Sequence, residues 1–127
     1  MIKTLFTCLL LLFAMTSQSQ NCSNFRTGLF KLSDDVFGKT IISRTETEQT
    51  ETNKDHDVKM VYSINWTSKC SYELQPKKLL KGDPIYFGNP GDVIIAEIIK
   101  ADGNTFTVKV TSNFSDQVNE FEMVKMK

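Results

Sequence analysis

The chain has 127 residues, of which 15 are basic and 15 acidic, so its formal net charge at pH 7 is zero. A chain of this length supplies one domain with a modest core. Because the charges balance, no net field attracts the protein to nucleic acid or to anionic lipid, and we expect no nucleic-acid partner. Nucleotide-binding fingerprints are absent from the sequence.

The N-terminus has the pattern of a cleavable secretory signal peptide. A positively charged start precedes an apolar run over residues 5–15, and Ser17 and Ser19 are the small residues that a signal peptidase reads. A membrane-spanning helix needs roughly twenty apolar residues, which is about twice this run. We therefore expect residues 1–19 to be a signal peptide and 20–127 to be a single secreted or periplasmic β domain without a transmembrane segment.

Two cysteines, Cys22 and Cys70, remain after removal of the predicted signal. Lipid attachment at Cys22 is not expected, because the preceding Gln20 and Asn21 are bulky and polar, whereas lipid-attachment signals place small residues beside the cysteine. An even pair of cysteines in an oxidising compartment predicts a disulfide bond. Two separate buried thiols are the alternative.

Two-residue alternation of apolar and polar side chains predicts β-strands along the rest of the chain. In chain order the expected strands cover residues 26–32, 40–52, 58–66, 70–75, 93–100, 105–111 and 121–126. The last run is expected to pair near an edge or with the first strand. Residues 53–57 and 101–104 are turn candidates, the irregular segment 33–39 is expected to hold one helical turn, and 79–92 to form a long loop around Tyr86 and Phe87.

Such a series of short strands joined by tight turns predicts an all-β fold, an antiparallel meander of six to eight strands. A meander buries its edges best by closing into a small up-and-down barrel. A two-sheet sandwich fits the same alternation and is the alternative.

Five aromatic residues are the candidates for a ligand cavity. Alternation turns Tyr62, Trp66 and Tyr72 towards the interior, and Tyr86 and Phe87 on the long loop are placed to cover it. A small eight-stranded barrel has room for its own side chains or for one small ligand. These aromatic residues therefore either fill the core or line a cavity.

Part of this pattern recurs in known proteins. The residues concerned are Cys22-x-x-Phe25-x-x-Gly28-x-Phe30, then Ile42-x-Arg44, Gln49 and Glu51, then Ile64-x-Trp66-x-x-x-Cys70-x-Tyr72-x-Leu74. They resemble a family of short, uncharacterised secreted bacterial proteins, and the resemblance supports the predicted fold and disulfide without implying an activity. Some members carry a DNA topoisomerase label, but this chain is too short for strand passage and has no excess of basic residues.

The opening Gly28-x-Phe30 followed by a meander is also similar to lipocalin-like small barrels. By analogy, this second resemblance implies the binding of a small ligand.

The single histidine, His56, lies between Asp55 and Asp57 in a predicted turn. A catalytic imidazole must lie beside a nucleophile and a third, orienting group, and a zinc site needs three or four converging ligands. A turn tip provides neither arrangement. We therefore expect a solvated turn, no metal site and no cofactor.

Two acidic residues, Glu46 and Glu48, are the candidates for hydrolysis. On one strand they would lie on the same face about 7 Å apart, within the range that glycosidases use. A hydrolase using these carboxylates, or an acid of the loop 84–92, is therefore the alternative function. A solvated strand face that discourages aggregation explains the same glutamates, and we expect no catalytic residue.

The sequence thus predicts an exported, non-enzymatic β-barrel that binds a small apolar ligand or an envelope protein. A hydrolase and a purely structural or interaction protein are the alternatives.

Overall fold

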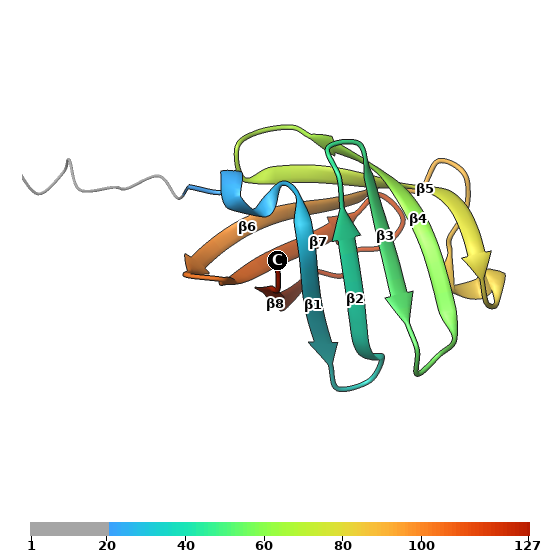
Figure 1. Ribbon diagram of the computed structural model, residues 1–127. Coiled ribbons are helices and arrows are strands. Elements are labelled where there is room, and N and C mark those ends of the chain that lie inside the picture. Colours follow the sequence, from blue (N-terminus) through green and yellow to red (C-terminus); the bar gives the residue numbers. More distant parts are fainter. Residues whose placement is uncertain (1–20) are drawn as a thin grey trace, which may run out of the picture.

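The computed structural model describes residues 21–127, in which eight antiparallel strands close into one barrel (Figure 1). The strands are β1 (Gly28–Asp34), β2 (Gly38–Arg44), β3 (Glu48–Asn53), β4 (Val58–Trp66), β5 (Ser71–Lys81), β6 (Ile94–Asp102), β7 (Thr105–Ser112) and β8 (Asn119–Lys125). Each strand pairs with the next, and β8 returns to β1, so the predicted up-and-down barrel is confirmed and the sandwich is excluded. The predicted signal peptide, residues 1–19, lies outside the described residues.

Alternation along the strands builds the core. The fully buried apolar side chains include Phe30 of β1, Ile42 of β2, Tyr72 of β5, Phe106 of β7 and Met123 of β8. Because inward and outward positions alternate, one face of every strand contributes to the interior. Strand β3 differs because its buried side chains are polar: they are those of Gln49 and Asn53.

Up-and-down connections place alternate loops at the same end of the barrel. We call one end the loop end; it carries the connections 35–37, 54–57, 82–93 and 113–118. The other, the capped end, carries the short turns 45–47, 67–70 and 103–104, both termini of the described chain, and the 3-10 helix η2 (Ser23–Phe25).

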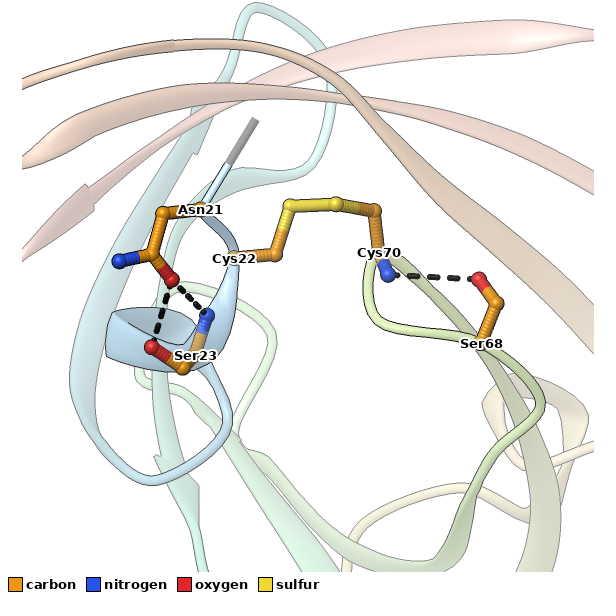
Figure 2. The surroundings of a disulfide bond; sticks show 5 residues. All are labelled: Asn21, Cys22, Ser23, Ser68 and Cys70. Carbon is orange, nitrogen blue, oxygen red and sulfur yellow. Dashed lines mark hydrogen bonds between the residues drawn. A yellow bond between two sulfur atoms is a disulfide. The ribbon is translucent and has the colours of Figure 1, made fainter. Parts of the chain in front are cut away.

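A disulfide bond between Cys22 and Cys70 holds η2 against the capped end (Figure 2). The Cα atoms of the two cysteines are 5.3 Å apart, and they are separated by 48 positions in the sequence. Beside the bond, Phe25 is fully buried and stacks on Phe106 at 4.2 Å between ring centroids. The predicted disulfide is therefore confirmed, and it joins the N-terminal segment to the β4–β5 turn.

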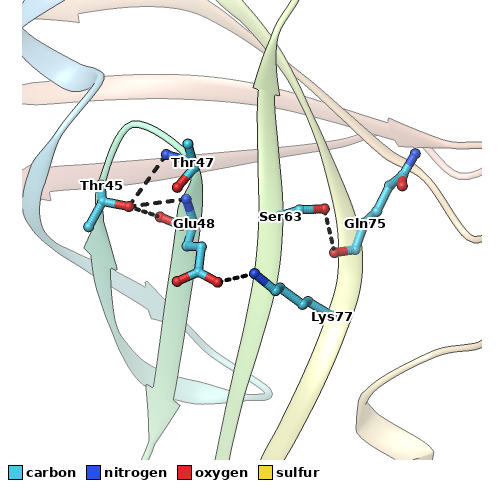
Figure 3. Close-up of polar contacts among 6 residues, drawn as sticks. All are labelled: Thr45, Thr47, Glu48, Ser63, Gln75 and Lys77. Carbon is cyan, nitrogen blue, oxygen red and sulfur yellow. Dashed lines mark hydrogen bonds and ion pairs between the residues drawn. The ribbon is translucent and has the colours of Figure 1, made fainter.

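Two expected elements differ from the structure. The predicted strand 40–52 is wrong as a single strand: β2 ends at Arg44 and β3 begins at Glu48. Thr45 explains the turn, because its hydroxyl accepts hydrogen bonds from the backbone N–H groups of Thr47 and Glu48 (Figure 3). Thr and Glu residues alternate through this turn as they would along a strand. A turn formed by a side-chain hydroxyl does not change this alternation, so the pattern does not reveal it.

The expected helical turn in 33–39 is also wrong. Strands β1 and β2 instead form a hairpin, in which the Asp34 carboxylate accepts a hydrogen bond from Phe37 N–H. Gly38 has φ of +84°, a conformation that glycine adopts without penalty. Strand β5 continues to Lys81, so the loop predicted over 79–92 begins at residue 82, three residues later than expected.

The ladder between β5 and β6 is short. Only Ser71–Leu74 of β5 pairs with β6, whereas the same strand pairs with β4 almost along its whole length. The remainder of β5 faces the connection 82–93, which contains the 3-10 helix η3 (Pro84–Tyr86). This interval is where the loop end has a hollow.

Candidate ligand-binding site

A hollow of about 190 Å³ lies at the loop end, beside the interval between β5 and β6. Its lining residues are Tyr62, Pro76, Ile85, Tyr86, Phe87, Gly88, Asp92, Ile94 and Phe114. The buried Tyr62 of β4 packs against Phe87 of the connection at 6.2 Å between ring centroids. The barrel core and the connection thus meet at this hollow.

Side-chain caps set the shape of the connection 82–93. Asp83 accepts a hydrogen bond from Ile85 N–H at 3.0 Å and so begins η3, with Pro84 in the first helical position. Asp92 accepts a hydrogen bond from Asn89 N–H at 2.8 Å and closes the following turn. The aromatic side chains of this segment are therefore held by local hydrogen bonds.

Asn113 links this connection to the neighbouring one, 113–118. Its side chain accepts a hydrogen bond from Val93 N–H at 2.8 Å and donates one to the Gly91 carbonyl at 2.9 Å. Phe114 follows directly and lines the hollow. One amide side chain thus fixes the relative position of the two walls.

A second hollow, of about 200 Å³, adjoins the first. Ile94 and Phe114 line both of them, and Val110 and Phe121 line the second. Apolar side chains also stand in solvent at this end: Ile85 is 79% and Phe114 56% exposed. The loop end therefore combines recesses with exposed apolar side chains.

His56 lies in the β3–β4 turn, as predicted, but its ring is half-buried in an aromatic stack. It stacks on Phe37 at 4.4 Å, and Tyr86 lies 5.7 Å from it. Asn53 supports this arrangement by donating to the Phe37 carbonyl and accepting from His56 N–H. Three connections of the loop end meet here, so this histidine packs between them.

The five aromatic residues predicted to line a cavity divide into two groups. Tyr62, Tyr86 and Phe87 line the first hollow. Trp66 and Tyr72 lie at the capped end, where their ring centroids are 4.7 Å apart. The sequence pattern places all three strand residues on one face, but Trp66 is the last residue of β4 and lies about 13 Å along the strand from Tyr62.

Arg44 lies in the interior of the barrel at the capped end and is only 2% exposed. Its guanidinium donates hydrogen bonds to the Phe25 carbonyl at 2.7 Å, the Gln49 side chain at 2.9 Å and the Tyr72 hydroxyl at 3.0 Å. It also lies over the rings of Phe30 and Tyr72, at 4.9 Å and 4.6 Å from their centroids. One cation therefore joins η2, β2, β3 and β5.

Glu51 extends this cluster into the barrel. Gln49 donates a hydrogen bond to its carboxylate at 2.8 Å and so connects it to Arg44. Burial raises the pKa of Glu51, while the Gln49 hydrogen bond and the Arg44 charge act in the opposite direction. Burial also raises the pKa of Tyr62 and Tyr72, so both hydroxyls stay protonated at neutral pH.

Arg44 and Glu51 were not among the site residues predicted from the sequence, although both belong to the residue series that carries the resemblance. Arg44 lies two positions after buried Ile42, and Glu51 lies two positions after Gln49. The same alternation that predicted the core therefore predicts that both point inward. A charged residue at a position that alternation turns inward is the signal that could have identified both.

The glutamates considered for hydrolysis do not share a strand face. Glu46 lies in the β2–β3 turn, 3.9 Å from Arg26, and Glu48 begins β3. Figure 3 shows Glu48 reaching Lys77 of β5 across the outward face of β4. The expectation of two carboxylates on one strand face is therefore wrong, because the strand ends before Glu46.

No protein-family model, curated protein or solved structure matches this chain. Within residues 21–127, no three His, Cys, Asp or Glu side chains are grouped so that they could hold a metal ion. The same residues contain no helix that is long and apolar enough to cross a membrane.

Replacing Glu51 with glutamine should make stability less dependent on pH. A carboxyl whose pKa is raised on folding binds protons more tightly in the folded state, so wild-type stability falls as pH rises from 4.5 through the folded-state pKa. The introduced amide would still accept the Gln49 hydrogen bond but would not ionise. Urea unfolding between about pH 4 and pH 8 should show the variant gaining stability relative to wild type as pH rises.

Glu120→Gln is the matched control, because Glu120 is exposed on β8. It should show no such gain. A Glu51→Gln difference that stays constant across the pH range would contradict a raised pKa at Glu51.

Proposed function

We propose that this protein is an exported, non-enzymatic β-barrel that binds a small apolar ligand in the hollow at its loop end. The observation that carries the proposal is the lining of the hollow: of its nine residues, only Asp92 is charged. Binding sites for small molecules are concave, mostly apolar and provided with few polar groups. The first hollow has this composition.

The volume limits the ligand. A dry apolar cavity of about 150 Å³ takes up benzene, and sites for drug-sized molecules begin at about 300 Å³. The hollow, at about 190 Å³, therefore fits one aromatic ring or a short alkyl group. A larger ligand would insert only such a part.

Two further observations support the proposal. The hydrogen bonds of Asp83, Asp92 and Asn113 hold the walls in place, which lowers the ordering cost on binding. The Cys22–Cys70 bond is of the kind that persists in oxidising compartments, in agreement with export. The apolar side chains at the loop end are the ones that a ligand would cover.

The test is an NMR titration of isotope-labelled protein with benzyl alcohol, a neutral probe with one ring. We expect amide shifts that map to the connections 82–93 and 113–118. Phe114→Ala should weaken binding about tenfold, because it removes an aromatic wall of the hollow.

Val118→Ala is the matched control, because Val118 is equally exposed in the same connection (58%) but does not line the hollow. It should leave the affinity unchanged. Shifts spread evenly over the barrel, or no shifts at saturating probe, would end the proposal.

A further inference from the structure

The connections at the two ends of the barrel differ in charge. The four connections of the loop end contain one lysine and six aspartates, namely Asp35, Asp55, Asp57, Asp83, Asp92 and Asp116. The turns and terminal segments of the capped end contain Arg26, Lys69 and Lys127 against the single acid Glu46. The connections themselves therefore carry an excess of acidic residues, whereas lysines such as Lys39, Lys59 and Lys81 lie on the adjoining strand ends.

Most of this negative charge is not neutralised within the protein. In residues 21–127, only Asp57 among the six aspartates forms an ion pair, with Lys81 at 2.8 Å. Asp83 and Asp92 accept hydrogen bonds from neutral backbone N–H groups, which leave their charge uncompensated.

Asp92 brings this charge to the hollow itself. It is the one charged residue of the lining and is half-buried. Within residues 21–127 its carboxylate accepts one hydrogen bond, from Asn89 N–H, through one of its two oxygens. A carboxylate has acceptor sites on both oxygens, and a hydrogen bond from a cation to a carboxylate is stronger than a neutral one.

We propose that the ligand is an organic amine, with its apolar group in the hollow and its ammonium against the Asp92 carboxylate. This inference rests on the proposed function and specifies its ligand class. The ring or alkyl chain would contact Phe87 and Phe114, and the ammonium would lie beside Asp92 at the edge of the hollow. An anionic ligand of the same size would be repelled by the Asp92 carboxylate.

Three probes with the same ring test the inference: 2-phenylethylamine, benzyl alcohol and phenylacetate, titrated into wild-type protein and followed by NMR. At low ionic strength the amine should bind up to about fivefold more tightly than the alcohol, and phenylacetate more weakly than either. The preference for the amine should decrease as salt is added.

Asp92→Asn should remove the preference for the amine, so that the variant binds 2-phenylethylamine and benzyl alcohol with similar affinity. Asparagine keeps an oxygen that can accept the Asn89 hydrogen bond, so the turn is preserved. Asp102→Asn is the control, because it removes the same charge at the capped end of β6. It should leave the order of the three probes as in wild type.

The outcomes separate the two proposals. Equal binding of the three probes in the hollow overturns the amine inference and leaves apolar binding intact. Amine shifts confined to the aspartates, without shifts at Phe87 and Phe114, also overturn it. No binding of any probe overturns both.

Discussion

Replacing Cys22 and Cys70 together with alanine is expected to lower the free energy of unfolding by about 4 kcal/mol. The bond connects positions 48 apart, so it removes many conformations from the unfolded chain. For a domain of this size the melting temperature should fall by about 15–30 °C. Thermal and urea unfolding of both proteins measure the effect.

Reduction supplies the control for this experiment. A reducing agent should destabilise wild type by a similar amount and leave the Cys22→Ala/Cys70→Ala variant unchanged. Ser68→Ala removes the hydrogen bond to Cys70 N–H without breaking the bond between sulfurs, and its effect should be small. A loss of less than about 1 kcal/mol in the double variant would show that η2 is held mainly by packing.

Arg44→Met should cost a comparable amount, about 3–5 kcal/mol. The substitution leaves the Phe25 carbonyl, the Gln49 side chain and the Tyr72 hydroxyl without their donor in a buried place. It also removes the positive charge that favours ionised Glu51. Arg44→Lys should recover only part of the loss, because an ammonium cannot match the geometry of the guanidinium.

Arg26→Met is the matched control. Arg26 also lies over an aromatic ring, at 4.8 Å from the Trp66 centroid, but its side chain is 36% exposed. Its replacement should cost less than about 1 kcal/mol in the same urea unfolding experiment. Equal losses for the two arginine variants would mean that the buried hydrogen bonds of Arg44 contribute little.

Alternation predicted most of the barrel because one side of each strand faces the core. The predicted strand 58–66 matches β4 at both ends. The predicted strand 121–126 overlaps β8, and β8 pairs with β1, which is one of the two placements expected for it. The predictions failed where a side-chain hydrogen bond, and not the two-residue alternation, determines the backbone conformation. The Thr45 hydroxyl and the Asp34 carboxylate each cap a turn that continues a strand-like or helix-like pattern.

The candidate site was predicted only in part. Tyr62 of β4 lines one hollow together with the loop residues Tyr86 and Phe87, the arrangement expected from the sequence. Phe114 and Asp92 could not be assigned to the same hollow, because the contact between their connections depends on Asn113. Trp66 is separate from the hollow because it ends β4 at the capped end; two-residue periodicity gives the face of a residue and not the end of the barrel at which it lies.

The short ladder between β5 and β6 has a consequence for self-association. Strand edges recruit strands from other molecules, and the residues of β5 after Leu74 have no ladder partner in β6. Pro76 removes a backbone donor there, and Lys78, which forms no ion pair within residues 21–127, would repel the same residue of a second copy. The wall can therefore stay incomplete beside the hollow without starting polymerisation into fibrils.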